Sequence, residues 1–162
     1  MKKKQETDGS WFGRWGVNYI YGTGLVLPSL RSAGEEMGRS YVRGAADWLK
    51  RMQHEDGGWG ETCATYHDPS TKGQGPSTAS QTAWALMGLV AAGDGGDRCA
   101  RAGVDYLLRA QQKDGSWLER DFTGTGFPRA FYLRYELYSA YFPLLALSAF
   151  KSVQKEAKDA SN

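Results

Sequence analysis

Residues 53–59, QHEDGGW, decide the fold because the same pattern occurs at two other places in the chain. Q-x-x-D-G-x-W is found as QETDGSW at 5–11 and as QQKDGSW at 111–117. The copies start 48 and 58 residues apart, from 5 to 53 and from 53 to 111, which is the length of a helical hairpin with its loops. This recurrence predicts a repeat architecture. Its defining residues, the Gln, Gly and Trp of each copy, are Gln5, Gly9, Trp11, Gln53, Gly57, Trp59, Gln111, Gly115 and Trp117.

The segments around the copies predict two kinds of helix. Residues 41–53 and 98–111 precede the second and third copies, and each places apolar side chains on one helical face and charged side chains on the other. Residues 80–92, 17–33 and 131–150 are apolar or aromatic on most faces, so they are expected to be buried helices.

Local signals refine the buried helices. Ser77 or Ser80 is expected to cap the helix over 80–92, because a hydroxyl accepts a hydrogen bond from a free backbone N–H of the first turn. Pro28 and Pro143 are expected to kink or end their helices, since proline lacks an N–H. No segment alternates strictly between apolar and polar residues, so no strand is expected.

Alternation of one-faced and buried helices predicts two concentric layers, with the repeated motif as the turn between them. Its Gly permits a tight reversal, and its Gln amide is expected to bond free backbone groups at the next helix terminus, covered by the Trp. This role is structural. The predicted fold is an incomplete all-α segment, since such repeats bury their cores against neighbours and the sequence starts inside the first motif.

Composition excludes several classes of function. Twenty basic and 18 acidic side chains are spread along the chain, so nucleic acid is not an expected partner. Cys63 and Cys99 are too few for a disulfide framework, which favours a reducing compartment. No export signal follows the basic residues 2–4, and the apolar stretches 83–92 and 141–150 are about half a membrane span. The expected location is the cytoplasm, with peripheral contact at the inner membrane face left open.

Four sequence blocks carry a family resemblance. They are DGSWFGRWGVNYIYGTG at 8–24, DGGWGE at 56–61, SQTAWALM at 80–87, and GTGFP with the following FYL within 124–133. Together with the repeats, called QW repeats in that family, they resemble the C-terminal part of squalene-hopene cyclase, a triterpene cyclase, over about residues 5–150.

The resemblance implies a fold and a reaction. The fold would be an α/α toroid, with residues 1–150 as the C-terminal part of the cyclase domain and 151–162 as a polar tail. The substrate would be squalene, cyclised to hopene or hopanol after protonation of an alkene. The family uses no metal or organic cofactor, so none is expected here.

An aromatic stripe supplies the candidate site. Phe131, Tyr135 and Tyr138 are spaced i, i+4 and i+7, which places them on one face of the helix expected over 131–150. Aromatic faces stabilise a cation without supplying a good nucleophile, so this face suits a carbocation. The alternative is core packing, which the spacing alone favours and the matching blocks disfavour.

The resemblance assigns individual roles to the candidate residues. Phe131 would stabilise a late cation, and Phe127 lies in the loop before it. Tyr135 and Tyr138 match further cavity aromatics. Trp15 and Tyr21 match positions near the polar end of the cavity, where Tyr21 would assist the acid through hydrogen bonds.

The chain lacks the family's acid. Protonation of an alkene needs a carboxylic acid activated by neighbouring carboxyls, which the family supplies as D-x-D-D, and this pattern is absent from all 162 residues. We therefore expect a partial cyclase that is inactive alone and needs an N-terminal cyclase segment that carries the acid.

Two other classes remain as alternatives. Protein prenyltransferase β-subunits have a similar toroid and bind zinc through Asp, Cys and a later His. Asp97 and Cys99 imitate the first two ligands, but His54 and His67 both precede them. The second alternative is a non-catalytic helical module that binds a lipid or a partner in its aromatic groove without turnover.

Overall fold

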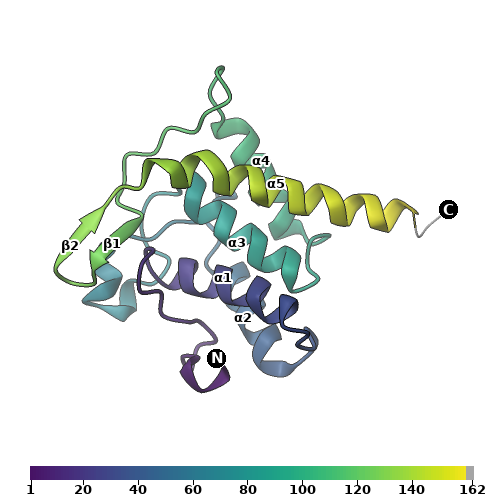
Figure 1. Ribbon diagram of the computed structural model, residues 1–162, viewed down its shortest axis with the longest axis horizontal. Coiled ribbons are helices and arrows are strands. Elements are labelled where there is room, and N and C mark those ends of the chain that lie inside the picture. The colour runs from purple at the N-terminus through teal and green to yellow at the C-terminus, as the bar shows by residue number, and fades with distance from the viewer. Residues whose placement is uncertain (160–162) are drawn as a thin grey trace.

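The computed structural model describes residues 1–159 and is mostly helical (Figure 1). Three short 3-10 helices lie in the loops, at Lys2–Lys4, Cys63–Tyr66 and Pro69–Thr71. The main elements in chain order are α1 (Tyr19–Ser32), α2 (Ser40–Arg51), α3 (Ala79–Ala91), α4 (Arg98–Ala110), β1 (Gly124–Phe127), β2 (Phe131–Leu133) and α5 (Glu136–Asp159).

The helices form the two layers that the sequence predicts. Helices α1, α3 and α5 lie side by side with α3 in the middle, while α2 packs on α1 and α3 and α4 packs on α3 (Figure 1). Every residue of α3 except Met87 is buried, whereas α2 and α4 bury one face each. The prediction of one-faced outer helices and apolar inner helices is therefore confirmed for α1 to α4.

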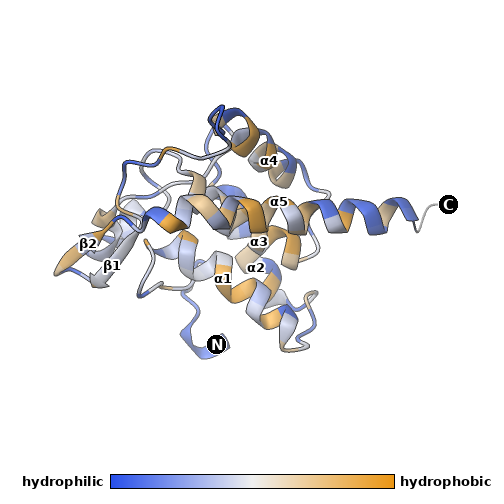
Figure 2. Cartoon of the chain, turned by 45° about the horizontal axis from the view of Figure 1, so that its top comes forward, coloured by the Kyte–Doolittle hydropathy of each residue, from blue (hydrophilic) through white to orange (hydrophobic). Residues whose placement is uncertain are grey.

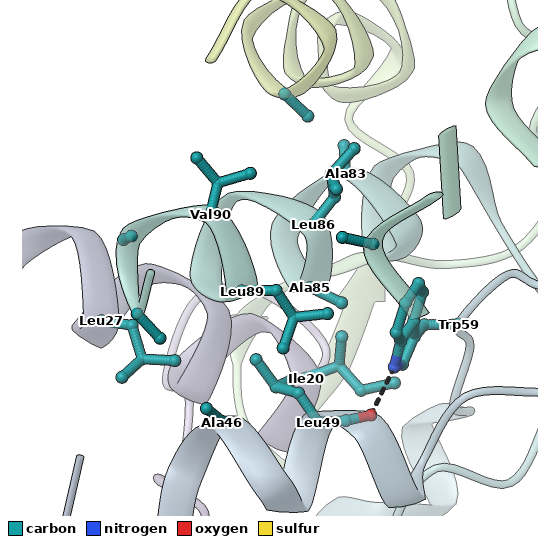
Figure 3. Packing of buried hydrophobic residues seen from close by; sticks show 14 of the residues in the cluster. Ile20, Leu27, Ala46, Leu49, Trp59, Ala83, Ala85, Leu86, Leu89 and Val90 are labelled. Carbon is teal, nitrogen blue, oxygen red and sulfur yellow. Dashed lines mark hydrogen bonds between the residues drawn. The ribbon is translucent and has the colours of Figure 1, made fainter. Parts of the chain in front are cut away.

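The hydrophobic core lies where the inner layer meets the outer helices (Figure 3). Leu86 and Leu89 of α3 are fully buried in the same cluster as Ile20 of α1 and Leu49 of α2. Each such side chain contributes about 1.5–3 kcal/mol by leaving water. Trp59 belongs to the same cluster and lies beside Leu49 of α2 (Figure 3).

The second QW motif fastens α2 to α4. The Gln53 side-chain amide donates to the carbonyl oxygens of Gly57 (2.9 Å) and Cys99 (2.8 Å), so it joins its own loop to the first turn of α4. The Trp59 indole donates to the Leu49 carbonyl near the end of α2 (2.7 Å). The glutamine bonds the terminus of the next helix as expected, whereas the bond from the tryptophan to the preceding helix was not predicted. We call this arrangement of the motif's Gln, Gly and Trp the clasp.

The first clasp repeats this geometry and the third is only half made. The Gln5 amide donates to the carbonyls of Gly9 and Tyr41, both at 2.8 Å. The Gln111 amide donates to Gly115 (3.0 Å) and, within residues 1–159, bonds no other helix. The first two motifs therefore each hold a following outer helix, and the third motif holds none of the described helices.

The prediction of a helix over 131–150 is wrong at its start. Helix α5 starts only at Glu136, and Phe131 lies in β2, which pairs antiparallel with β1. A turn with Arg129 at φ 68° separates the strands, and the Thr125 hydroxyl donates to the Phe131 carbonyl (2.9 Å). The expectation of no strand was also wrong, because this pairing is too short to produce an alternating pattern.

Smaller corrections concern helix ends. Thr78, rather than Ser77 or Ser80, caps α3 by accepting from the Gln81 amide. Pro28 and Pro143 lie inside α1 and α5 and end neither helix. Helix α5 continues across residue 150 to Asp159, and residues 160–162 of the expected tail lie outside the described residues. None of the helices within residues 1–159 has the length and apolar character needed to cross a membrane.

Replacing Gly57 by Ala tests the close approach inside the clasp. Gly57 has φ +85°, and an added Cβ would lie 2.6 Å from the Ala102 carbonyl oxygen of α4. We expect Gly57→Ala to lower the free energy of unfolding by about 3 kcal/mol, measured by urea denaturation, from backbone strain and steric overlap together.

Gly93→Ala is the matched control. Gly93 has a similar φ of +88° but nothing within 4 Å of the added Cβ, so only the backbone strain of about 1 kcal/mol should remain. Equal losses in the two variants would contradict the close packing of the motif against α4.

Candidate functional site

Backbone pairing brings the first sequence block, residues 8–24, to the hairpin formed by β1 and β2. The Trp15 carbonyl accepts from the Thr125 amide (3.0 Å), and the Val17 amide donates to the Thr123 carbonyl (3.0 Å). Residues more than 100 positions apart in the sequence are thereby joined beside the start of α1. Strand β1 lies at one end of the inner layer (Figure 1), and these bonds place Trp15 beside it.

Two buried glutamates fix the starts of the inner helices. Glu61 accepts from the backbone amides of Asn18 (3.0 Å), Ile20 (2.6 Å) and Gly73 (3.2 Å), which anchors the start of α1. Glu119 accepts from the Ser80 amide (3.0 Å) and the Ser80 hydroxyl (2.8 Å) at the start of α3.

These glutamates were not predicted, although the sequence carries a signal for them. Glu61 and Glu119 each follow the motif tryptophan by two residues, so the second and third copies read Q-x-x-D-G-x-W-x-E, while the first copy has Gly13 there. Each glutamate serves the inner helix of the preceding repeat. Burial raises the pKa of both carboxyls, and the donated hydrogen bonds oppose that shift.

An aromatic cluster joins the three inner helices around Trp84 of α3. The Trp84 ring lies 4.9 Å from Tyr21 of α1 and 5.7 Å and 5.4 Å from Tyr138 and Phe142 of α5, in edge-to-face contacts measured between ring centroids. Tyr135 approaches Tyr138 at 4.8 Å. Of the predicted site residues, Tyr21, Tyr135 and Tyr138 are therefore brought together. We call these rings the Trp84 cluster.

Trp84 itself was not among the predicted site residues. It lies in the SQTAWALM block, and its position on a helix that is apolar all round marked it as core. The side chain is fully buried, and its indole N–H has no hydrogen-bond partner within residues 1–159. Tyr141 and Phe142 of α5 were missed as well, because they fall outside the quoted blocks.

The other predicted residues lie at the hairpin rather than in the Trp84 cluster. Phe127 and Phe131 face each other across the strand pair at 6.2 Å and are 58% and 48% exposed. Trp15 is 48% exposed, and the Arg14 guanidinium lies 5.1 Å from its ring centroid. The prediction that Phe131, Tyr135 and Tyr138 share a helix face is wrong, because only Tyr138 lies in α5.

Two phenols of the Trp84 cluster, Tyr21 and Tyr138, are uncharged at neutral pH. Burial raises the pKa of Tyr138 to about 12 and also raises the pKa of Tyr21 and Tyr141. These phenols therefore remain protonated and do not act as bases. Aromatic rings and neutral hydroxyls are groups that can stabilise a cation.

The described part of the chain holds no group of three or more His, Cys, Asp or Glu that could bind a metal ion. Asp97, which imitates a zinc ligand in the sequence, caps α4 by accepting from the Cys99 amide (2.8 Å) and pairs with Lys50 (3.0 Å). These contacts account for Asp97 as a helix cap and an ion-pair partner.

The arrangement of inner and outer helices defines the class by fold, an incomplete α/α toroid. An ent-copalyl diphosphate synthase from Streptomyces platensis has the same fold with a TM-score of 0.63 and 24% identity, over 91% of this chain and 26% of that one. A type II terpene cyclase from Scytonema matches with a TM-score of 0.62 and 18% identity, over 93% of this chain and 49% of that one.

Sequence comparison gives the family. Residues 1–152 match the squalene-hopene cyclase C-terminal domain, and the chain belongs to this family. It is 50% identical over 156 residues to the squalene-hopene cyclase of Zymomonas mobilis, covering 96% of this chain and 24% of that protein. It is 52% identical over 151 residues to the squalene-hopene cyclase of Alicyclobacillus acidocaldarius, covering 93% and 24%. The chain thus spans about a quarter of the length of these relatives.

Replacing Glu61 tests how the candidate site is positioned. Glu61→Ala leaves three buried amide donors without their acceptor, and we expect it to lower the free energy of unfolding by about 3 kcal/mol or more, measured by urea denaturation. It should also loosen Tyr21 against Trp84, visible as a change in near-ultraviolet circular dichroism.

Glu55→Ala is the control, since Glu55 is exposed in the second motif. This change should alter neither the stability nor the aromatic signal. An equally small effect of Glu61→Ala would show that the carboxylate does not anchor α1.

Proposed function

We propose that this chain forms part of the wall of a cavity in which squalene or a related isoprenoid is cyclised to a pentacyclic product, hopene or hopanol. The observation that carries the proposal is the Trp84 cluster, because it is aromatic, contiguous across α1, α3 and α5, and built within a member of the squalene-hopene cyclase family.

The chemistry explains why the wall is aromatic. Polycyclisation moves a positive charge along a hydrocarbon, and a nearby base or water would end it by deprotonation or capture. An aromatic face stabilises a cation by about 0.5–2 kcal/mol without doing either. The raised pKa of Tyr138, about 12, keeps its phenol protonated and supports this role.

Different parts of the site receive different roles. Tyr135 and Tyr138 would face the migrating charge from α5, and Phe127 and Phe131 would stabilise the later cations from the hairpin. Tyr21 and Trp15, on the first block, would lie toward the acid, where Tyr21 supplies a neutral hydroxyl. Their common support is the backbone pairing of the first block with β1 and the contact of Tyr21 with Trp84.

The proton would come from another part of the enzyme. The chain has no D-x-D-D and corresponds to about a quarter of its relatives, so we assign the acid to an N-terminal cyclase segment. No metal or organic cofactor is needed for this route. The cytoplasm, with peripheral contact at the inner membrane face, is the location that suits a hydrocarbon substrate dissolved in lipid.

The proposed function predicts how the chain behaves by itself. The purified 162-residue protein should bind squalene without cyclising it, because it lacks an acid strong enough to protonate an alkene. Product mass spectrometry after incubation checks this. Co-expression with a cyclase segment that carries D-x-D-D and ends before the position of Gln5 should restore pentacyclic product.

Cyclised product from the chain alone would contradict the assignment of the acid. A stable, co-purifying pair that binds squalene and gives no product would instead favour the non-catalytic module.

The proposed function also predicts an effect of Phe131 in the enzyme reconstituted by co-expression with the N-terminal segment. Phe131→Ala should divert product toward incompletely cyclised skeletons, since the loss of up to about 2 kcal/mol of cation stabilisation slows the later steps up to roughly 30-fold. Gas chromatography with mass spectrometry gives the product ratio.

Phe122→Ala serves as the matched control, because Phe122 is also exposed and its ring contacts no other aromatic ring within residues 1–159. It should leave the product ratio unchanged. An unchanged ratio in Phe131→Ala would assign that residue to packing.

A further inference from the structure

A compact loop after the second motif lies between the first sequence block and the hairpin. The ends of residues 62–74 are joined by the bond from the Thr62 amide to the Gln74 carbonyl (3.0 Å). Glu61, just before the loop, accepts from the Gly73 amide (3.2 Å) and also from the start of α1. Loops whose ends are close in this way are packed by their own side chains and frequently carry function. We call residues 62–74 the bridging loop.

The base of the bridging loop is fixed to the first motif. The Lys72 ammonium donates to the Asp8 carboxylate (2.8 Å) and to the Ser10 hydroxyl (3.0 Å). It also lies 3.9 Å from the ring centroid of Tyr19, at the start of α1. The Lys72 side chain is 13% exposed, so solvent screens these contacts little. The bridging loop is therefore a fixed support and not a mobile lid.

Tyr66 of the bridging loop contacts the first block and the hairpin at once. Its hydroxyl donates to the Gly16 carbonyl (2.7 Å), and its ring stacks on Tyr132 of β2 with the centroids 5.8 Å apart. Burial raises the pKa of Tyr66, so the hydroxyl keeps the proton that it donates. His67, the next residue, is hydrogen bonded through Nε2 to the Tyr132 hydroxyl (3.0 Å). Two neighbouring residues of the loop thus hold β2.

Arg129 makes a further bond to the loop from an unusual backbone conformation. Its φ of 68° lies in the left-handed region, where glycine is the default residue because a Cβ is strained there. The Arg129 Nε donates to the carbonyl of Tyr66 (2.6 Å), a residue that is only 1% exposed. Backbone strain that persists at a residue points to a functional constraint on it. The bond to the bridging loop explains why this turn carries arginine.

Strand β2 lies at the outer edge of the paired segments. Strand β1 pairs with the first block on one side and with β2 on the other. Within residues 1–159, the hydrogen bonds that reach 128–133 from outside the hairpin come from Tyr66 and His67. The position of Phe131 in β2 therefore depends on the bridging loop.

The views of the molecule agree with this arrangement. The hairpin and the short 3-10 helices of the bridging loop lie together at one end of the molecule (Figure 1). The end of the hairpin that joins its two strands carries hydrophobic residues (Figure 2), and Phe127 and Phe131 are both exposed. Exposed rings on an outer strand hold one position only when neighbouring residues fix the strand. The bridging loop provides these residues.

We propose that the bridging loop sets the position of the hairpin against the first block, with Arg129 and Tyr66 as positioning residues for Phe131. Neither residue is assigned a contact with the substrate. Arg129 acts through the turn, and Tyr66 acts through β2 and the Gly16 carbonyl. Only the effect on the product rests on the proposed function, in which Phe131 stabilises the later cations.

Hydrogen exchange in the 162-residue chain tests the positioning of the hairpin. Arg129→Gly removes the bond to Tyr66 and relieves the strain of the positive φ, so the variant keeps its fold while β2 loses its support. Exchange of the amides in 128–133, measured by mass spectrometry of peptides, should rise at least about tenfold. Arg134→Ala is the matched control. It removes an exposed ion pair with Glu136 directly after β2 and should change this exchange by less than about twofold.

Product analysis in the reconstituted enzyme tests the effect on the reaction. Arg129→Gly should shift the product ratio toward incompletely cyclised skeletons by at least about threefold, with an unchanged KM for squalene, because the later cations form only after binding. The double variant Arg129→Gly/Phe131→Ala should give the ratio of Phe131→Ala alone, since a positioning residue has no effect once its ring is gone. Tyr66→Phe, which removes the bond to Gly16 and keeps the ring, should act in the same direction as Arg129→Gly.

Unchanged exchange in Arg129→Gly would overturn the proposal, whatever the products. So would a product ratio that changes in Phe131→Ala and not in Arg129→Gly, or additive effects in the double variant. Raised exchange with a product ratio that neither variant changes would overturn the proposed role of Phe131 in the reaction and leave the positioning of the hairpin standing.

Discussion

The rest of the structure depends on one glutamine side-chain amide that donates to two carbonyl oxygens. The Gln53 amide holds its own loop and the first turn of the next outer helix together, and the indole of Trp59 holds the end of the preceding one. An inner helix such as α3, apolar on every face, is stable only when covered on several sides. The clasp fixes the outer helices that provide part of this cover.

The same constraint places the aromatic residues. Because α1, α3 and α5 must lie side by side, rings at the facing positions of three helices meet around Trp84. Glu61 and Glu119 fix the helix starts from the loops, so their carboxylates lie at the ends of α1 and α3 and are bonded to backbone amides. The inner layer thereby combines a polar, hydrogen-bonded end with an aromatic side, and the proposed function depends on this arrangement.

The layers and the clasp could be predicted from sequence because they repeat and depend on local periodicity. Expected bounds of the outer helices, 41–53 and 98–111, lie within two residues of α2 and α4. The segment 131–150 was misread because aromatic residues at i, i+4 and i+7 fit a helix equally well, whereas the hairpin depends on pairing with residues 124–127 and on a turn at Arg129. Trp84 was missed because a helix that is apolar on every face does not show which of its buried rings meet the rings of neighbouring helices.

Amide hydrogen exchange in the unmodified chain tests the role of the clasp most directly. The amides of Gly9, Gly57 and Gly115 make the same bond within their loops, to the residue three positions earlier, and differ in whether an outer helix is docked beside them. Slow exchange at Gly9 and Gly57, with at least about tenfold faster exchange at Gly115, is the predicted result. Equal protection at all three positions would contradict it, because the loops would then be stable without the helices that they are said to hold.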